Sequence, residues 1–356
     1  MLRSLPWLPA VLLLACSTPA AAPPAGTVRE PSAAPAAVAS PVGAVREPPA
    51  APAAPPPRRS LNYGLVNFSA FYWPIYVGLD EGLYDAAGFD VEPVVTRSGA
   101  DGMSAMLGGS IDVNTMNTEV VVLAQTRGAD VIGVAGFHNK AVYSMMVQPE
   151  FQQLTDLRGK KLGASALRTG EVIFMKALLQ KYGLSERDYD LIVAGPSRNR
   201  VSAMTTHQID GTVMPPPDSF ILEDAGIKNL AEVTEAVPAY EFQMLAVTRA
   251  WAQGNEDALV RFLRAHINTL KWLYDPANKE RATAILRDRM QLSDDHARRT
   301  YASFIEQEQM FSRQGEISPA GLTAMEEMLV ASGEATPPLP SRDRYIDLRY
   351  IEQAQR

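Results

Sequence analysis

The sequence NFSAFYWPIYVGLDEGLYDAAGFDVEPVV, residues 67–95, decides the fold of this chain. The apolar run before it, residues 61–66, predicts a strand, and Pro74 suits the start of a helix that continues over 75–81. A second strand is predicted over 89–95. Strand, helix and strand at this spacing form a βαβ unit, so the aromatic loop between the first strand and the helix is expected at the carboxyl edge of a parallel sheet. Open α/β sheets bind their ligands at that edge.

The alternation of strands and helices continues along the chain. The pattern predicts a helix over residues 100–107, a short strand over 111–113 and a loop over 114–118. A helix over 119–126 and a buried strand over 131–137 follow. Strands that alternate with helices in this way predict an α/β fold.

Two nine-residue segments, SAMLGGSID at 104–112 and SAMTTHQID at 202–210, share the pattern S-A-M-x4-I-D. Each ends a predicted helix and begins a strand, so the repeat indicates two lobes built on one plan; a chance match of short windows is the alternative. Segments 142–148 and 242–248 are predicted to cross between the lobes as a two-strand hinge.

The expected architecture is therefore α/β, with two doubly wound lobes joined by this hinge and preceded by a disordered tether. The predicted organisation is a signal peptide over 1–15, a tether over 16–60, a first lobe from 61–146 plus 244–356, and a second lobe over 147–243.

The composition is that of a soluble globular protein. The chain has 356 residues, which is long enough for two domains. Of these residues 46% are hydrophobic, and the mean hydropathy is -0.09. The net charge of -7 argues against a nucleic-acid binder, because phosphate contacts need clustered lysine and arginine. The same charge disfavours peripheral binding to anionic lipid.

The amino terminus has the features of an export signal. Arg3 precedes an apolar run of eleven residues at 5–15, which is shorter than the ~20 that a membrane-spanning helix needs. The segment LLAC at 13–16 matches a bacterial lipobox, and Cys16 is the only cysteine in the chain. We expect lipidation of Cys16; an ordinary secretory signal with an incidental cysteine is the alternative. Residues 17–60 are rich in Ala and Pro and predict a spacer without secondary structure.

The aromatic loop with PIYVGLDEGLY at 74–84, followed by GFDVEP at 88–93, resembles extracytoplasmic substrate-binding proteins of the nitrate/sulfonate/taurine and thiamine-pyrimidine class. The segment LTDLRGK at 154–160 is similar to that family's start of the second lobe, and the resemblance spans residues 61–332. It implies a type II periplasmic-binding-protein fold and a partnership with an ABC permease.

Candidate ligand residues lie on the first lobe. Five aromatic residues cluster in and beside the first loop, and consecutive aromatic side chains cannot all point into the core. The resemblance makes this loop a ligand wall, so Ser69, Tyr72 and Trp73 are predicted to contact ligand; core packing is the alternative for the aromatic residues. Asn117 and Thr118 end the next loop, where Thr118 either caps a helix or binds ligand.

The second lobe contributes a polar loop with Ser165, Arg168, Thr169 and Gly170 as candidates. Backbone N–H groups at the start of the following helix favour an anionic group. The resemblance to the sulfonate and nitrate branches implies that Arg168 helps to hold the anion; a surface arginine is the alternative. Pro216 belongs to the segment MPPPD, which the resemblance implies as a rigid cleft wall. Its Asp218 either caps a helix or binds an amine.

Catalytic and metal-binding patterns are weak. The four histidines, His138, His207, His266 and His296, have no metal-ligand spacing, and the chain has no HExxH, CxxC, GxSxG or phosphate-loop motif. His138 either faces the cleft or is structural, with the structural role favoured. We therefore predict no catalytic residue, no metal and no cofactor.

The sequence predicts a monomeric, lipid-anchored solute-binding protein outside the cytoplasm. Its ligand would be a sulfonate, an aromatic acid or a pyrimidine-like molecule, delivered to an ABC permease. An enzyme resembling thiamine-pyrimidine synthases is one alternative, although their C-C-C-G-C signature is absent. An extracytoplasmic sensing subunit is the other.

Overall fold

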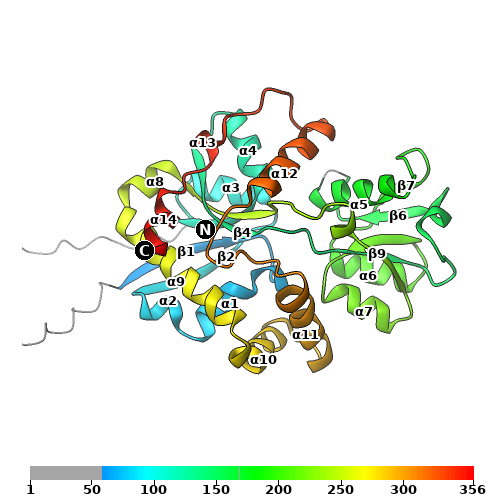
Figure 1. Ribbon diagram of the computed structural model, residues 1–356, viewed down its shortest axis with the longest axis horizontal. Coiled ribbons are helices and arrows are strands. Elements are labelled where there is room, and N and C mark those ends of the chain that lie inside the picture. The colour runs from blue at the N-terminus through cyan, green and yellow to red at the C-terminus, as the bar shows by residue number, and fades with distance from the viewer. Residues whose placement is uncertain (1–57, 168) are drawn as a thin grey trace, which may run out of the picture. The chain divides into compact units, whose positions relative to one another are not determined.

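The computed structural model describes residues 58–167 and 169–356 (Figure 1). The predicted signal peptide, the tether up to residue 57, the lipidation site Cys16 and the candidate ligand residue Arg168 lie outside the described residues. Among the residues described, no helix is both long and apolar enough to span a membrane.

The first sheet has the strand order β2-β1-β3-β10-β4. Its strands are β1 (Arg59–Leu65), β2 (Phe89–Val95), β3 (Val113–Asn117), β4 (Val131–His138) and β10 (Gln243–Thr248). β1 pairs in parallel with β2 and β3, whereas β10 is antiparallel to both of its neighbours. The last strand in the chain therefore lies inside the sheet that the first strand begins.

The second sheet repeats this plan with the order β7-β6-β8-β5-β9. Its strands are β5 (Ser144–Val147), β6 (Lys161–Ala164), β7 (Asp190–Val193), β8 (Gly211–Met214) and β9 (Lys228–Glu232). Here β5 is the antiparallel strand, inserted between β8 and β9. Two sheets with one topology confirm the predicted two-lobed α/β class. The chain enters the second sheet at Ser144, slightly before the predicted lobe boundary at residue 146.

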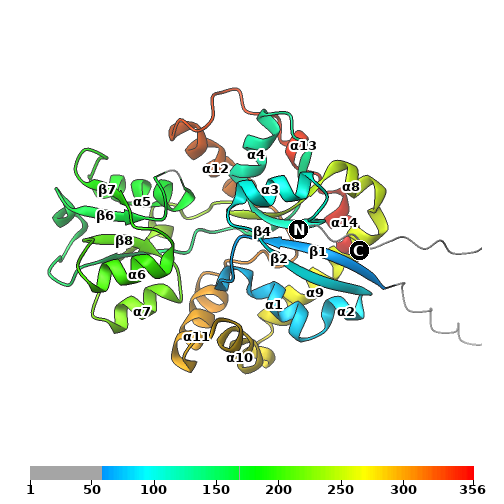
Figure 2. The same cartoon turned by 180° about the vertical axis from the view of Figure 1, so that it is seen from behind.

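Helices cover the edges and faces of the two sheets (Figures 1 and 2). The first sheet carries α1 (Trp73–Asp80), α2 (Leu83–Ala86), α3 (Gly99–Leu107), α4 (Thr118–Thr126), α8 (Arg249–Gly254), α9 (Glu256–Tyr274), α10 (Lys279–Met290), α11 (Asp294–Tyr301), α12 (Pro319–Ala331), α13 (Arg342–Tyr345) and α14 (Arg349–Gln355). The second carries α5 (Gly170–Lys181), α6 (Ser197–Thr205) and α7 (Asp218–Asp224). The apolar face of the long α9 is buried against α1 and α14.

The sequence repeat has a structural cause. Asp112, at the end of the first copy, accepts a hydrogen bond at 2.8 Å from the backbone N–H of Asn62 in β1. Asp210, at the end of the second copy, accepts one of the same length from the backbone N–H of Lys161 in β6. Asp112 thus ties the turn before β3 to β1, and Asp210 ties the turn before β8 to β6 in the same way. The repeat therefore marks equivalent positions in the two lobes.

One strand is misplaced by the sequence pattern. We predicted a strand over 111–113 and a loop over 114–118, but β3 runs from Val113 to Asn117 and α4 begins at once with Thr118. The polar run Asn-Thr-Met-Asn suggested a loop. It forms a strand that pairs with β1 and β10, where Thr115 hydrogen-bonds the buried Tyr63 hydroxyl and Asn114 lies beside the cavity described below.

Candidate functional site

A cavity of about 410 Å³ lies between the carboxyl ends of the first sheet's strands and the start of α5 in the second lobe. Both lobes contribute to its walls. The first lobe provides Asn67, Phe71, Tyr72, Asn114, Asn117 and Glu119, and the second provides Tyr143, Thr169, Gly170 and Ile173. Phe242 and Gln243, where the chain returns to the first sheet, and Glu334, which follows α12, also line it. A volume of this size fits a small organic molecule.

Four of the predicted ligand residues, Tyr72, Asn117, Thr169 and Gly170, line this cavity. These four residues therefore lie in the wall of a cavity, as predicted, and their contact with a ligand stays a prediction. The Tyr72 hydroxyl accepts a hydrogen bond at 3.2 Å from the backbone N–H of Val66, which fixes the ring at the end of β1.

Other candidates of the first lobe lie away from the cavity. Trp73 is fully buried; its indole N–H donates to the Ala282 carbonyl at 3.1 Å, and its ring packs edge-on against Tyr301. Trp73 therefore belongs to the core, as the alternative interpretation had it. The backbone N–H of Ser69 bonds the Tyr76 hydroxyl, and Thr118 is buried at the start of α4 without a side-chain capping bond.

Of the second-lobe candidates, Ser165 and Pro216 do not line the cavity, in contrast to Thr169 and Gly170. The backbone N–H of Ser165 donates to Glu171 at 2.6 Å, so this residue is tied to the first turn of α5 rather than to the cavity. Pro216 is buried next to β8 and does not line the cavity. Asp218 begins α7 without capping it, and burial raises the pKa of its carboxyl group.

A chain of three polar side chains forms one wall of the cavity. The Gln243 amide donates to Asn117 Oδ1 at 2.9 Å, and Asn117 Nδ2 donates to Glu119 Oε1 at 2.9 Å. An ionised carboxylate only accepts hydrogen bonds, so Glu119 fixes the orientation of Asn117 and, through it, that of Gln243. Two acceptors, Glu119 Oε2 and Gln243 Oε1, have no hydrogen-bond donor among the described residues.

Glu119 is an unusual acid for this position. Its side chain is only 7% exposed, and burial raises the pKa of its carboxyl group to about 7, with the Asn117 hydrogen bond acting in the opposite direction. Glu334, another cavity residue, adds a second negative charge nearby. Within the described part of the chain, no Lys, Arg or His lines the cavity.

Replacing Glu119 with Gln is expected to raise the free energy of unfolding of the ligand-free protein by about 3 kcal/mol at pH 8 and to change it little at pH 4. In the unfolded chain the carboxyl group ionises near 4.5, and in the folded protein near 7. The wild type therefore loses stability as pH rises through this window, whereas the variant does not. Urea denaturation from pH 4 to 8 measures the difference; parallel profiles for the two proteins would contradict it.

Aromatic rings form another part of the cavity wall. Phe71, Tyr143 and Phe242 pack with ring centroids 5.8–6.2 Å apart. His138 extends this group, and its Nε2–H donates to the Phe71 carbonyl at 2.8 Å, so His138 positions the loop rather than meeting the ligand. Burial lowers the pKa of His138 to about 3, which keeps the ring neutral.

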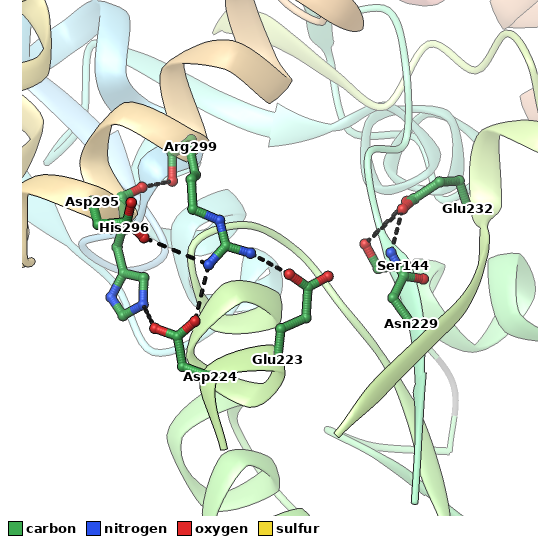
Figure 3. Close-up of polar contacts among 9 residues, drawn as sticks. Ser144, Glu223, Asp224, Asn229, Glu232, Asp295, His296 and Arg299 are labelled. Carbon is green, nitrogen blue, oxygen red and sulfur yellow. Dashed lines mark hydrogen bonds and ion pairs between the residues drawn. The ribbon is translucent and has the colours of Figure 1, made fainter. Parts of the chain in front are cut away.

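Away from the residues that line the cavity, α11 of the first lobe contacts α7 of the second (Figure 3). The Arg299 guanidinium bonds Glu223 and, at 3.1 Å, Asp224; it also lies 4.2 Å from the centre of the Phe220 ring. His296 contacts Asp224 at 2.7 Å. Asp224, Asp295 and His296 have the spacing of metal ligands, but Arg299 already contacts both carboxylates. These residues therefore form an ion-pair network between the lobes.

A separate acid of the second lobe lies outside the cavity. Glu232, at the end of β9, accepts hydrogen bonds from Ser144 Oγ at 3.0 and 3.1 Å and from Asn229 Nδ2 at 2.6 Å (Figure 3). Burial raises the pKa of its carboxyl group, as it does for Glu119. Glu232 thus offers a matched comparison for a substitution in the cavity.

The sequence reasoning missed Glu119, Tyr143, Phe242 and Gln243. Glu119 follows two predicted ligand residues directly, so its place at the start of α4 was a usable signal. Phe242 and Gln243 were assigned only to the hinge. Their place in the cavity depends on β10 returning to the first sheet, which no local pattern specifies.

A family model described as NMT1/THI5 like matches residues 70–279. A binding protein of Brucella abortus (strain 2308) is 24% identical over 292 residues, which are 79% of this chain and 89% of that protein. The formylaminopyrimidine-binding protein of Halalkalibacterium halodurans is 22% identical over 226 residues, 60% of this chain and 64% of that protein.

Solved structures share the fold. The periplasmic nitrate-binding protein NrtA from Synechocystis PCC 6803 superposes with a TM-score of 0.69 at 13% identity, over 83% of this chain and 88% of that one. The desulfurization enzyme DSZB superposes with a TM-score of 0.63 at 14% identity, over 84% and 99%. The fold therefore accommodates both binding and catalysis.

Proposed function

The chain belongs to the NMT1/THI5-like family, and from this premise we propose that it is the solute-binding component of an ABC importer. It captures one small organic molecule between its lobes outside the cytoplasm and presents the closed form to a permease. The observation that carries this proposal is the cavity of about 410 Å³ whose walls come from both lobes. A ligand that contacts both walls binds the closed form more tightly than the open form, and this difference drives closure.

A thermal-shift screen of the full-length chain tests the proposal. The library contains sulfonates, aromatic acids, pyrimidines and aromatic amidines. We expect at least one class to raise the melting temperature in proportion to the logarithm of its concentration. Absence of any stabilising compound, or steady turnover of a bound compound without a partner protein, would contradict it.

Arg299→Ala is expected to weaken ligand binding about fivefold while it leaves the melting temperature of the ligand-free protein within a few degrees. Each exposed ion pair contributes only ~0.2–1 kcal/mol to stability. The ion pairs of Arg299 connect the two lobes, so their loss affects the closed form. If the variant destabilises only the closed form, by about 1 kcal/mol, the dissociation constant of the ligand rises about fivefold. Calorimetric titration with a ligand from the screen measures the change. Arg298→Ala, which removes an exposed arginine that pairs with Glu280 of the first lobe, is the control; equal effects of the two variants would contradict a role for Arg299 in closure.

The lipid anchor is part of the proposal. The lipobox at 13–16 supports acylation of Cys16, and the Ala/Pro-rich tether gives the lobes reach from the membrane. Cys16→Ser is expected to move most of the protein from the membrane fraction to the soluble fraction, measured by ultracentrifugation and immunoblotting. Unchanged membrane retention would contradict lipidation.

The DSZB superposition keeps an enzyme as the second candidate function. Glu119, buried in the cavity with a pKa raised to about 7, is the observation that favours it, because such a group suits acid-base chemistry. A ligand from the screen that is recovered chemically unchanged after long incubation would contradict catalysis.

A further inference from the structure

We propose that the ligand is a planar organic cation whose N–H groups donate to Glu119 and Gln243, and that anions such as sulfonates are excluded. This inference rests on the proposed solute-binding function and names the chemical class that this cavity takes. Three features of the cavity support it: acceptors without donors, a concentration of negative charge, and aromatic walls.

The first feature is the pair of unpartnered acceptors at the two ends of the polar chain. Glu119 and Gln243 are 7% and 5% exposed, and Glu119 Oε2 and Gln243 Oε1 lack a donor in the described structure. Leaving buried acceptors unpaired is unfavourable, whereas a bound molecule with two N–H groups satisfies both. Asn117 lies between them, accepts from Gln243 through Oδ1 and donates to Glu119 through Nδ2. A ligand that supplies donors to these two oxygen atoms is therefore favoured over one that supplies only acceptors.

The second feature is the sign of the charge. Glu119 and Glu334 line the cavity, and no basic side chain among the described residues balances them there. The start of α5, where the sequence predicted an anion, already has an acid of its own. Glu171 accepts the Ser165 N–H and pairs with the buried Arg200 at 2.8 Å. Glu119 Oε1 also lies only 3.4 Å from the position that a Cβ on Gly170 would take. An anion at the start of α5 would therefore meet the Glu119 carboxylate, which no described basic side chain balances, whereas Arg200 balances Glu171.

The third feature is the shape of the apolar wall. Phe71 and Phe242 meet nearly edge to face, and Tyr143 closes the group. Such rings favour a flat molecule and attract a cation over their faces. An amidinium group attached to a ring combines both properties, because it is planar, positively charged and rich in N–H donors. Its two nitrogen atoms match a carboxylate in the way that a guanidinium does.

Three probes of nearly identical shape test the proposal: benzamidine, benzamide and benzoate, which are positive, neutral and negative at pH 8. We measure their dissociation constants on the full-length chain by isothermal titration calorimetry. We expect benzamidine to bind at least tenfold more tightly than benzoate. Glu119→Gln should weaken benzamidine binding at least tenfold, whereas Glu232→Gln, the same change in a partly buried acid outside the cavity, should leave it within twofold.

The possible outcomes distinguish failure of the cation proposal from failure of the proposed solute-binding function. Tighter binding of benzoate than of benzamidine, or unchanged benzamidine binding by Glu119→Gln, would overturn the cation proposal and leave the solute-binding function in place. Failure of all three probes to bind, together with an empty thermal-shift screen, would overturn both. Circular dichroism and melting temperature of the Glu119→Gln protein establish that the variant is folded.

Discussion

Arg200→Leu is expected to lower the free energy of unfolding by about 3–5 kcal/mol, because it leaves Glu171 charged and buried without a partner. Arg200 is 2% exposed. Its guanidinium donates to Glu171 at 2.8 Å, to the Val213 carbonyl at 2.8 Å and to Thr212 Oγ1 at 3.1 Å. It thereby joins α6, β8 and the first turn of α5. Loss of this one side chain affects the whole core of the second lobe.

Urea denaturation measures the Arg200 effect, and two further variants define its origin. The double variant Arg200→Leu with Glu171→Gln should be more stable than Arg200→Leu alone, since no unpaired charge remains buried. Arg198→Leu, an exposed position on the same helix, should change stability by less than about 0.5 kcal/mol. Equal losses for Arg198→Leu and Arg200→Leu would contradict the ion-pair explanation.

Trp73→Ala is expected to destabilise the protein by about 3–5 kcal/mol, the range for removal of a large buried aromatic side chain. Trp73 is 0% exposed, and it connects α1 to α10 through its bond to Ala282 and to α11 through its contact with Tyr301. The residual affinity for a ligand from the screen, measured in conditions where the variant is folded, should stay within about threefold of wild type.

The same loop offers a control for Trp73. Phe68 is 56% exposed, so Phe68→Ala should change stability by less than about 0.5 kcal/mol. If Trp73→Ala keeps its stability within 1 kcal/mol but loses ligand binding, Trp73 is a cavity residue after all. In that case the core assignment is wrong and the sequence-based prediction of a ligand contact is right.

Most of the fold could be predicted because its patterns are local. The βαβ unit at 67–95 and the repeated S-A-M-x4-I-D segments specify strands, turns and helix ends within short windows. The two-lobed plan followed from them, and the matching sheets confirm it. The misplaced β3 shows the limit: polar residues that face a ligand cavity look like a loop when only composition is considered.

The site was harder to predict, since its residues meet through the tertiary structure. Tyr72 and Asn117 line the cavity as predicted from the convergence of parallel strand ends at one edge, and their contact with a ligand stays a prediction. Gln243 arrives there only through the late strand β10, and Tyr143 only through the passage to the second sheet. The charge of the cavity was also out of reach, because the expected anion depended on the N–H groups of α5 and on Arg168, whereas the Glu119 carboxylate that lines the cavity comes from α4 in the other lobe.

The position of β10 has a consequence for how the newly made chain acquires its shape. The strands of the second sheet are consecutive in the chain, from Ser144 to Glu232. All of them are therefore available as soon as residue 232 has been synthesised. The first sheet has a vacancy between β3 and β4 that is filled only roughly a hundred residues later. Closing so long a loop is slow. Folding is therefore expected to begin with the second sheet, in the middle of the chain. The first sheet is completed only afterwards, when β10 pairs between β3 and β4.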